Sequence, residues 1–221
     1  MSGITRNYQF AIFKTAKKNY MKKLSMMILT AAVITASAFT VADILPIGSE
    51  MPKADLKMKD VSGKEVSMKD VAKDNGILVM FSCNTCPYVV KNQHRTLEIS
   101  NYAQKMKVGV IILNSNEAYR AGDDSFEDMK AYAKDQKYKW NYVVDKNHEV
   151  ADAFGANRTP ECFLFDKKLK LVYHGAIDDN PSDESAVSQK HLQNAIDLIA
   201  AGKEVAVKET RSVGCTIKRN K

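Results

Sequence analysis

Two cysteines three residues apart, Cys83 and Cys86 in FSCNTCPYVV, are the residues of this sequence most able to do chemistry. They follow the apolar run 76–82, which predicts a strand buried on both faces, and they precede Pro87, which favours the first turn of a helix. Unpaired N–H groups and the helix dipole favour a thiolate at such a place, so we expect a lowered pKa for Cys83. Cys83 is then the predicted nucleophile, and Cys86, on the same helical face, is the predicted resolving thiol.

Zinc binding and a structural disulfide are the alternative interpretations of this motif. His94 follows Cys86 by eight residues, which on a helix is about 12 Å of rise, too far for both to bind one ion. The sequence holds no second C-x-x-C motif, so no metal is expected. A disulfide that closes so short a loop stabilises a fold little. The pattern favours a redox-active Cys83–Cys86 disulfide that needs no further cofactor.

Strands and helices alternate along the chain after its first part. A hairpin is predicted around Ser62-Gly63, and a second hairpin near the end joins two apolar strands. The predicted strands are 76–82, 108–115, 140–145, 161–166 and 170–176, and the predicted helices are 87–106, 125–138, 148–155 and 185–201. Such alternation implies an α/β fold whose central sheet is largely parallel, with an antiparallel edge from the second hairpin.

Residues 1–42 read as an N-terminal extension and signal peptide. Lys22 and Lys23 precede an apolar stretch, and cleavage is expected near Ala38 or Ala42; Met21 is an alternative start. The uncleaved stretch could instead anchor the chain in a membrane. The formal net charge of +7 comes mostly from this leader, since 27 basic and 26 acidic residues follow residue 38. We therefore expect export, to a periplasm for instance, and no nucleic-acid partner.

The stretches CNTCPYV, FGANRTPECFLFD, LVYHGAIDD and VGCTIK together resemble the thioredoxin superfamily, specifically its exported redoxin or peroxiredoxin-like branch. The resemblance implies a thioredoxin-like fold: a central mixed sheet flanked by helices, with an N-terminal β-hairpin extension. It covers residues 43–202, which would form the redoxin domain, and leaves residues 203–221 as a C-terminal tail. Thioredoxins proper carry W-C-G-P-C where this chain has S-C-N-T-C, so the direction of electron flow stays open.

The same resemblance implies further site residues. A cis-proline faces the active cysteines in such proteins, and Thr159-Pro160 holds that place in this sequence. The backbone of Thr159 would pair with an incoming peptide, so that substrate lies between Cys83 and this loop. Glu161 follows the proline; we expect an exposed polar residue, or alternatively a proton acceptor for Cys86.

The two remaining cysteines are harder to place. Cys162 lies in an apolar strand and is predicted to be a small core residue. Cys215 lies on the polar tail, where it is a candidate auxiliary thiol that forms a regulatory or relay disulfide with the active pair.

The predicted function is that of a thiol–disulfide oxidoreductase acting on protein thiols and disulfides, supplied by an upstream redox partner that could be membrane-bound. One alternative is a peroxiredoxin-like peroxidase. Such enzymes carry the motif P-x-x-x-[ST]-x-x-C, but this sequence has Gly76 in place of the proline and Met80 in place of the hydroxyl residue. Arg158 is available as the arginine, but it cannot replace the missing hydroxyl. The other alternative is a Cu(I)-binding chaperone of this fold, in which the two thiols and His174 would hold the ion.

Overall fold

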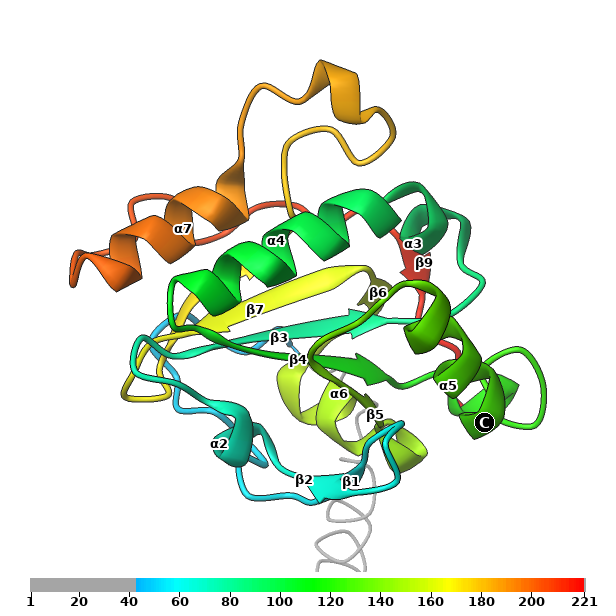
Figure 1. The fold of residues 1–221 in the computed structure, drawn as a ribbon. Coiled ribbons are helices and arrows are strands. Elements are labelled where there is room, and N and C mark those ends of the chain that lie inside the picture. The colour runs from blue at the N-terminus through cyan, green and yellow to red at the C-terminus, as the bar shows by residue number, and fades with distance from the viewer. Residues whose placement is uncertain (1–42, 221) are drawn as a thin grey trace, which may run out of the picture. The chain divides into compact units, whose positions relative to one another are not determined.

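A five-stranded mixed sheet forms the centre of the structure, a computed structural model that describes residues 43–220 (Figure 1). The strand order is β5-β4-β3-β7-β8, with β3, β4 and β5 parallel and with β7 and β8 antiparallel to their neighbours. The strands are β3 (Ile77–Ser82), β4 (Gly109–Asn114), β5 (Asn141–Val144), β7 (Glu161–Phe165) and β8 (Leu171–Gly175). The predicted α/β class, central sheet and antiparallel hairpin at its edge are confirmed.

Helices cover both faces of this sheet, which explains why every residue of β3 and β4 is buried. Leu78 and Met80 face a core built with α4, α5 and α7, whereas Val79 and Phe81 face a core built with α2 and α6. The helices are α2 (Met68–Val71), α3 (Pro87–Lys91), α4 (Gln93–Lys105), α5 (Phe126–Asp135), α6 (Glu149–Phe154) and α7 (His191–Ala200). Short 3₁₀ helices span Glu117–Tyr119, Lys146–His148 and Glu184–Ala186.

Two smaller strand pairs complete the fold. The predicted N-terminal hairpin is confirmed: β1 (Met58–Lys59) pairs with β2 (Glu65–Val66) in antiparallel register. The second pair joins β6 (Arg158–Thr159) to β9 (Cys215–Thr216), so a strand of the C-terminal tail lies beside the loop that precedes β7 (Figure 1).

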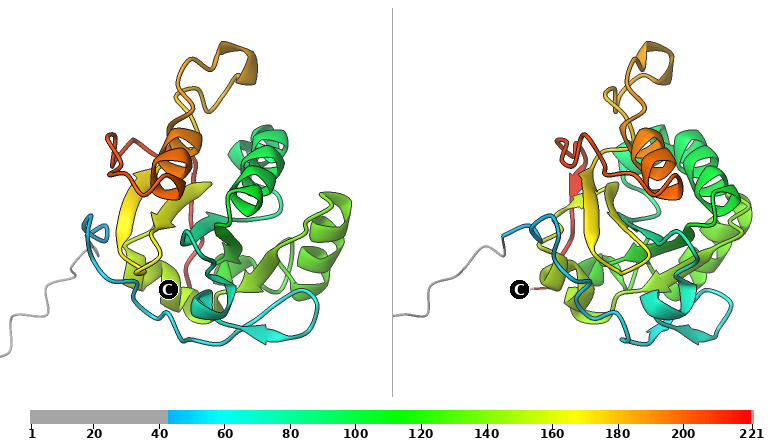
Figure 2. Two further views of the ribbon diagram at one scale, coloured as in Figure 1. Left: turned by 60° about the vertical axis from the view of Figure 1, so that its left-hand side comes forward. Right: turned by 90° about the vertical axis from the view of Figure 1, so that its left-hand side faces the viewer.

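Three predicted helices differ from the structure, and the first of these differences is small: the helix predicted for 125–138 ends at Asp135. The helix predicted for 87–106 is divided at Asn92, whose backbone leaves helical geometry and whose side-chain amide donates to the carbonyl oxygens of Tyr88 and Pro181. The last helix begins at His191 rather than Ser185, because Asp179 and Asp183 accept hydrogen bonds from nearby N–H groups and hold the preceding segment as a loop. Figure 2 shows this loop projecting beyond α7.

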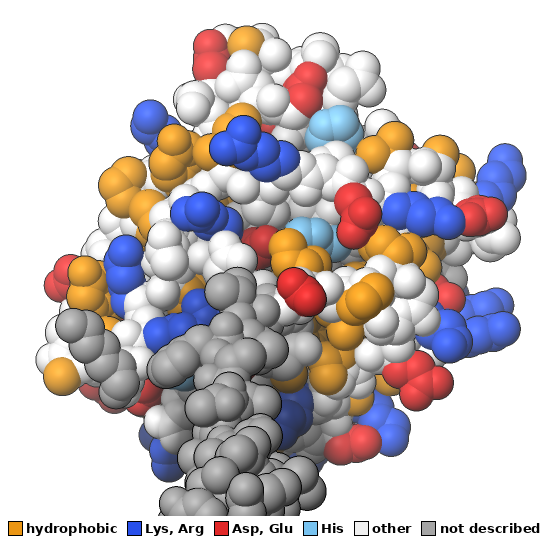
Figure 3. Space-filling view, turned by 180° about the vertical axis from the view of Figure 1, so that it is seen from behind, with side chains coloured by type: hydrophobic (Ala, Val, Ile, Leu, Met, Phe, Trp, Pro, Cys, Tyr) orange, Lys and Arg blue, Asp and Glu red, His pale blue; other side chains and the backbone are white. Residues whose placement is uncertain are grey.

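The predictions for the leader, including its start and cleavage sites, lie outside the described residues. Among residues 43–220, none of the helices has the length and apolar character needed to span a bilayer. On the face turned away from the viewer in Figure 1, basic and acidic side chains are interspersed (Figure 3). Where that face is not covered by grey atoms, the described side chains form no broad basic surface of the kind that binds nucleic acid.

Candidate functional site

The two motif cysteines lie where the central strand ends. Cys83 directly follows β3, and Cys86 is the N-cap residue of α3, with Pro87 at the first helical position. Cys86 therefore precedes the helix, and the expectation that it shares a helical face with Cys83 was wrong. Both residues are buried: Cys83 is 1% exposed and Cys86 is 7% exposed.

Asn84, between the cysteines, anchors their loop to the body of the domain. Its backbone N–H donates to Asp124 at 2.9 Å, and its side-chain amide donates to the carbonyl oxygen of Asp123 at 2.8 Å. Its side-chain oxygen accepts a hydrogen bond of 2.8 Å from the hydroxyl of Tyr142 on β5. Thr85 beside it is exposed. The loop is thus hydrogen-bonded to the domain at Asn84 and exposed to solvent at Thr85.

Replacing Asn84 with alanine should lower the free energy of unfolding by about 2 kcal/mol, because the Tyr142 hydroxyl and the Asp123 carbonyl would lose their buried partner. Chemical denaturation with matched m-values measures this difference. Thr85→Ala at the exposed neighbouring position is the control and should leave stability within about 0.5 kcal/mol of the wild type. Equal stability of the two variants would contradict the anchoring role of Asn84.

The Thr159–Pro160 peptide bond is cis, as the resemblance implied. Thr159 faces both motif cysteines: its hydroxyl oxygen lies 3.5 Å from the sulfur of Cys83, and its carbonyl oxygen lies 3.5 Å from the sulfur of Cys86. The structure therefore brings Thr159 and both cysteines together. The backbone of Thr159 is not open to a peptide, however, since it pairs with Cys215 of β9 and the residue is 1% exposed.

The disulfide in the structure joins Cys86 to Cys215, whereas the sequence led us to expect a Cys83–Cys86 disulfide. Cys83 is a free thiol. The Cys83–Cys86 disulfide stays a prediction about a different redox state. Cys162, also free, is buried on β7 in the core beside α4 and α7, as predicted, and its burial raises the pKa of its thiol.

The pKa of Cys83 is raised to about 11, so the expected lowering was wrong. Burial of the sulfur is the main cause, and the negative charge of Asp124 adds to it. Hydrogen bonds from Thr159 and from the N–H groups of Cys86 and Thr85 act in the opposite direction without offsetting the burial. The N-terminus of α3, a helix of five residues, does not decide the pKa of Cys83 in this environment.

Glu161 is buried, with 2% of its surface exposed, and the expectation of an exposed residue was wrong. One carboxylate oxygen lies 2.9 Å from Nε2 of His174, and the other accepts hydrogen bonds from the N–H groups of Asn157 and Arg158. Among the described residues, no hydrogen bond links Glu161 to a cysteine. The carboxylate therefore holds the cis-proline loop against β8 and is not placed beside Cys86.

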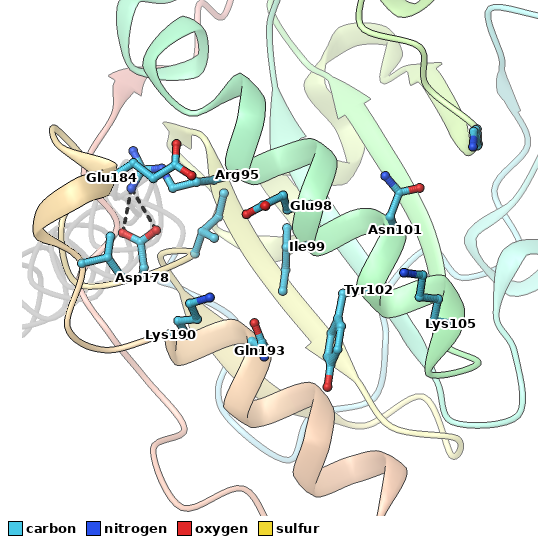
Figure 4. Close-up of a pocket in the computed structure, with 13 residues that line it drawn as sticks. Arg95, Glu98, Ile99, Asn101, Tyr102, Lys105, Asp178, Glu184, Lys190 and Gln193 are labelled. Atoms are coloured by element: carbon cyan, nitrogen blue, oxygen red, sulfur yellow. Dashed lines mark hydrogen bonds and ion pairs between the residues drawn. The ribbon is translucent and has the colours of Figure 1, made fainter.

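A cavity of about 710 Å³ lies between α4 and α7 (Figure 4). A buried ion pair closes one end of it, with Arg95 2.8 Å from Asp178. Its lining includes Ile99 and Tyr102 but neither Cys83 nor Cys86. The exposed groups His94, Glu98 and Glu184 gather beside it, and nothing else at that place points to a bound ion. The thiols therefore form the candidate site, and the cavity does not belong to it.

Asp124, Asn84 and Tyr142 are site residues that the sequence did not reveal. Asp124 accepts hydrogen bonds from the side chains of Asn114 and Asn116 as well as from the loop of the motif. It stands in a polar stretch whose composition resembles any surface loop, so the sequence carries no signal that separates it from its neighbours.

Residues 47–174 match the model of the AhpC/TSA family, which is more than half of the chain, and the chain belongs to that family. The curated thiol-disulfide oxidoreductase ResA of Bacillus thuringiensis is 26% identical over 161 residues, covering 71% of this chain and 87% of the relative. A solved structure described as an uncharacterized conserved protein, from Geobacillus kaustophilus, is 34% identical with a TM-score of 0.75, and the match covers 80% of this chain and 94% of that one.

The thioredoxin domain of a thiol-disulfide oxidoreductase from Bacteroides vulgatus shares the fold, with a TM-score of 0.50 at 23% identity over 60% of this chain and 89% of that chain. The chain is thus a thioredoxin-fold, redoxin-like protein, as the sequence predicted. The family and the names of its curated relatives support thiol–disulfide oxidoreductase activity.

Proposed function

We propose that this protein is an exported thiol–disulfide oxidoreductase that reduces disulfides of other proteins, with Cys83 as nucleophile and Cys86 as resolving thiol. The observation that carries the proposal is the arrangement around Thr159, whose hydroxyl and carbonyl oxygens lie 3.5 Å from the sulfurs of Cys83 and Cys86. Thiol–disulfide exchange needs two cysteines that lie close together, and Thr159 contacts the sulfurs of both cysteines at this end of β3.

The reaction takes two exchange steps. The thiolate of Cys83 attacks a substrate disulfide, forms a mixed disulfide and releases one substrate thiol. The thiolate of Cys86 then attacks the sulfur of Cys83, releases the second substrate thiol and leaves a Cys83–Cys86 disulfide. Two electrons pass to the substrate and are resupplied by an upstream redox partner. Since Glu161 is held by His174 and by backbone N–H groups, we assign the acceptance of the Cys86 proton to water.

The raised pKa of Cys83 supports reduction rather than oxidation of substrates. Strong disulfide oxidants stabilise the reduced form through a low-pKa thiolate. Burial and the charge of Asp124 outweigh the hydrogen bonds to Cys83 and raise its pKa while Cys86 is bonded to Cys215, so the thiolate of Cys83 has no net stabilisation in this state. A cysteine pair without a stabilised thiolate is more stable as a disulfide than as two thiols, and it therefore tends to donate electrons to a substrate disulfide.

Export is supported by the composition of the leader and by the presence of a disulfide, since disulfides persist outside the cytoplasm. Fusing residues 1–42 to an alkaline phosphatase that folds only outside the cytoplasm tests this part. Phosphatase activity in whole cells is the expected result, and activity at the level of a leaderless fusion would contradict export.

The two alternatives suggested by the sequence gain no support at the site. Met80, which stands where a peroxidase would have its hydroxyl residue, is buried in the core beside α4. Nε2 of His174 lies 2.9 Å from the buried carboxylate of Glu161, so this nitrogen already has a partner. We therefore propose neither a peroxidase nor a copper chaperone.

The reduction potential of the Cys83–Cys86 pair tests the proposed direction. Cys215→Ser isolates the pair, and equilibration with thiol buffers followed by acid trapping, alkylation and intact-mass measurement gives the potential. We expect a value of about −250 mV or below, as for thioredoxin-like reductants. A value near about −120 mV would make the protein an oxidant, and failure of the pair to cycle at all would remove the proposed activity.

A further inference from the structure

The C-terminal tail occupies the edge of the cis-proline loop where a substrate peptide would pair. β9 lies antiparallel to β6, with Cys215 opposite Thr159 and Thr216 opposite Arg158 (Figure 1). A Cβ atom on Gly214 would lie 2.3 Å from the carbonyl oxygen of Thr159, so only glycine allows the tail this close to the loop. The tail is therefore built to lie at the site.

Both flanks of β9 are anchored in the domain. Before it, the N–H of Thr210 donates to the carbonyl oxygen of His174 at 3.0 Å. After it, Ile217 is buried in the core beside α6, and its N–H donates to the carbonyl oxygen of Asn157 at 3.1 Å. These contacts do not depend on the disulfide, so they hold Cys215 close to Cys86 when both residues are reduced.

Three cysteines thereby surround a single residue, Thr159. Its hydroxyl contacts the sulfur of Cys83 and donates to the carbonyl oxygen of Cys215 at 3.4 Å, and its carbonyl oxygen lies beside the sulfur of Cys86. The Cα atoms of Cys86 and Cys215 are 6.3 Å apart, and these two residues are joined. Cys86 is thus bonded to Cys215 on the tail, while the free thiol of Cys83 lies three residues away in its own loop.

We propose that Cys215 is a third redox residue of the reaction cycle, which takes over the disulfide from Cys83 after each substrate has been reduced. The thiolate of Cys215 attacks the sulfur of Cys86 in the Cys83–Cys86 disulfide. The bond between Cys83 and Cys86 breaks, the bond between Cys86 and Cys215 forms, and Cys83 leaves as a thiolate that takes up the proton lost by Cys215. The protein keeps the same number of electrons, so the step needs no external oxidant.

The transfer of the disulfide places the reduction of substrate and the re-reduction of the protein at different sulfurs. Cys215 is half-buried, whereas Cys83 and Cys86 are buried, so an incoming reductant meets the disulfide at Cys215. Cys83 meanwhile returns to the thiol form beneath the tail. Substrates and the upstream reductant would thus react with different sulfurs of one site.

This inference rests on the proposed function, because it starts from a Cys83–Cys86 disulfide. The test follows the disulfides in time: the reduced protein receives one equivalent of glutathione disulfide, and samples are quenched in acid, alkylated in denaturant and digested with trypsin. A Cys83–Cys86 disulfide lies within the single peptide 74–91, whereas Cys86–Cys215 joins that peptide to 212–218. We expect the first species to appear early and to convert into the second.

Cys215→Ser should stop at the Cys83–Cys86 disulfide, with Cys162 as the only alkylated cysteine, whereas the oxidised wild type should be alkylated at Cys83 and Cys162. Cys83→Ser should form the Cys86–Cys215 disulfide at least tenfold more slowly than the wild type. Formation at the wild-type rate in Cys83→Ser would show a merely structural disulfide and overturn the inference. So would an oxidised wild type that retains Cys83–Cys86 and leaves Cys215 alkylated.

Gly214→Ala tests the role of the tail without touching a cysteine. The added methyl group cannot fit against Thr159, so conversion to the Cys86–Cys215 disulfide should slow at least tenfold. Gly122→Ala is the matched control, because a Cβ there meets its nearest atom at 3.9 Å, and it should convert as the wild type does. Conversion of Gly214→Ala at the wild-type rate would contradict the placement of the tail.

The two proposals fail separately. If Cys215→Ser still reduces a substrate disulfide in a single turnover while the wild type never forms Cys86–Cys215, the proposed function stands and the relay is wrong. If neither protein reduces a substrate disulfide, the proposed function is wrong, and the relay falls with it.

Discussion

Cys83→Ser is expected to abolish the reduction of protein disulfides, with a loss of at least about a thousandfold in rate, because the variant lacks the thiol that attacks the substrate disulfide. Serine keeps an oxygen near the sulfur position, within reach of the Thr159 hydroxyl, so the fold should persist. The measurement is the dithiothreitol-driven reduction of insulin, followed by turbidity, together with thermal unfolding to confirm the fold.

Two further variants sharpen this result. Cys86→Ser should accumulate a mixed disulfide between Cys83 and the substrate, visible by intact mass, since no thiol remains at the resolving position. Cys162→Ala is the control, because Cys162 is buried in the core away from Thr159, and it should retain activity. Full activity of Cys83→Ser, or a mixed disulfide attached to Cys86 in the wild type, would reverse the assigned roles.

The alkylation rate of Cys83 should rise about a thousandfold between pH 7 and pH 10. With a pKa of about 11, the thiol form dominates throughout that range. The reactive thiolate then increases tenfold with each pH unit and does not level off. The protein is treated with iodoacetamide while its Cys86–Cys215 disulfide is intact, and peptide mapping separates Cys83 from Cys162.

Thr159→Val should slow this alkylation by roughly tenfold at pH 8, because the hydrogen bond from the Thr159 hydroxyl lowers the pKa of Cys83 and its loss raises that pKa further. Thr216→Val, at an exposed position of the neighbouring strand, is the matched control and should leave the pH profile unchanged. A plateau near pH 7 or 8 in the wild type would show that the N-terminus of α3 governs the thiol after all.

The alternation of strands and helices, the N-terminal hairpin and the core position of Cys162 could be predicted from the sequence. These features follow from local signals: the apolar runs of β3 and β4 require burial on both faces, Ser125 caps α5, and Gly155 ends α6 in a left-handed conformation. Local signals also placed Cys83 and Cys86 at the end of the central strand. The break at Asn92 was missed; the side chain there donates both to Tyr88 nearby and to Pro181 far along the chain, and the second contact has no signal in the local sequence.

Two cysteines at a strand end and a proline loop able to face them were sufficient to predict the class of this protein. The pairing of the sulfurs could not be predicted in this way, since Cys86 and Cys215 are 129 residues apart and meet through the pairing of β6 with β9. The tertiary structure also decided the pKa of Cys83 and the burial of Glu161 against His174. The disulfide pairing, the pKa of Cys83 and the burial of Glu161 all depend on the residues that long-range packing brings around a side chain. The spacing of residues along the chain carries no information about that packing.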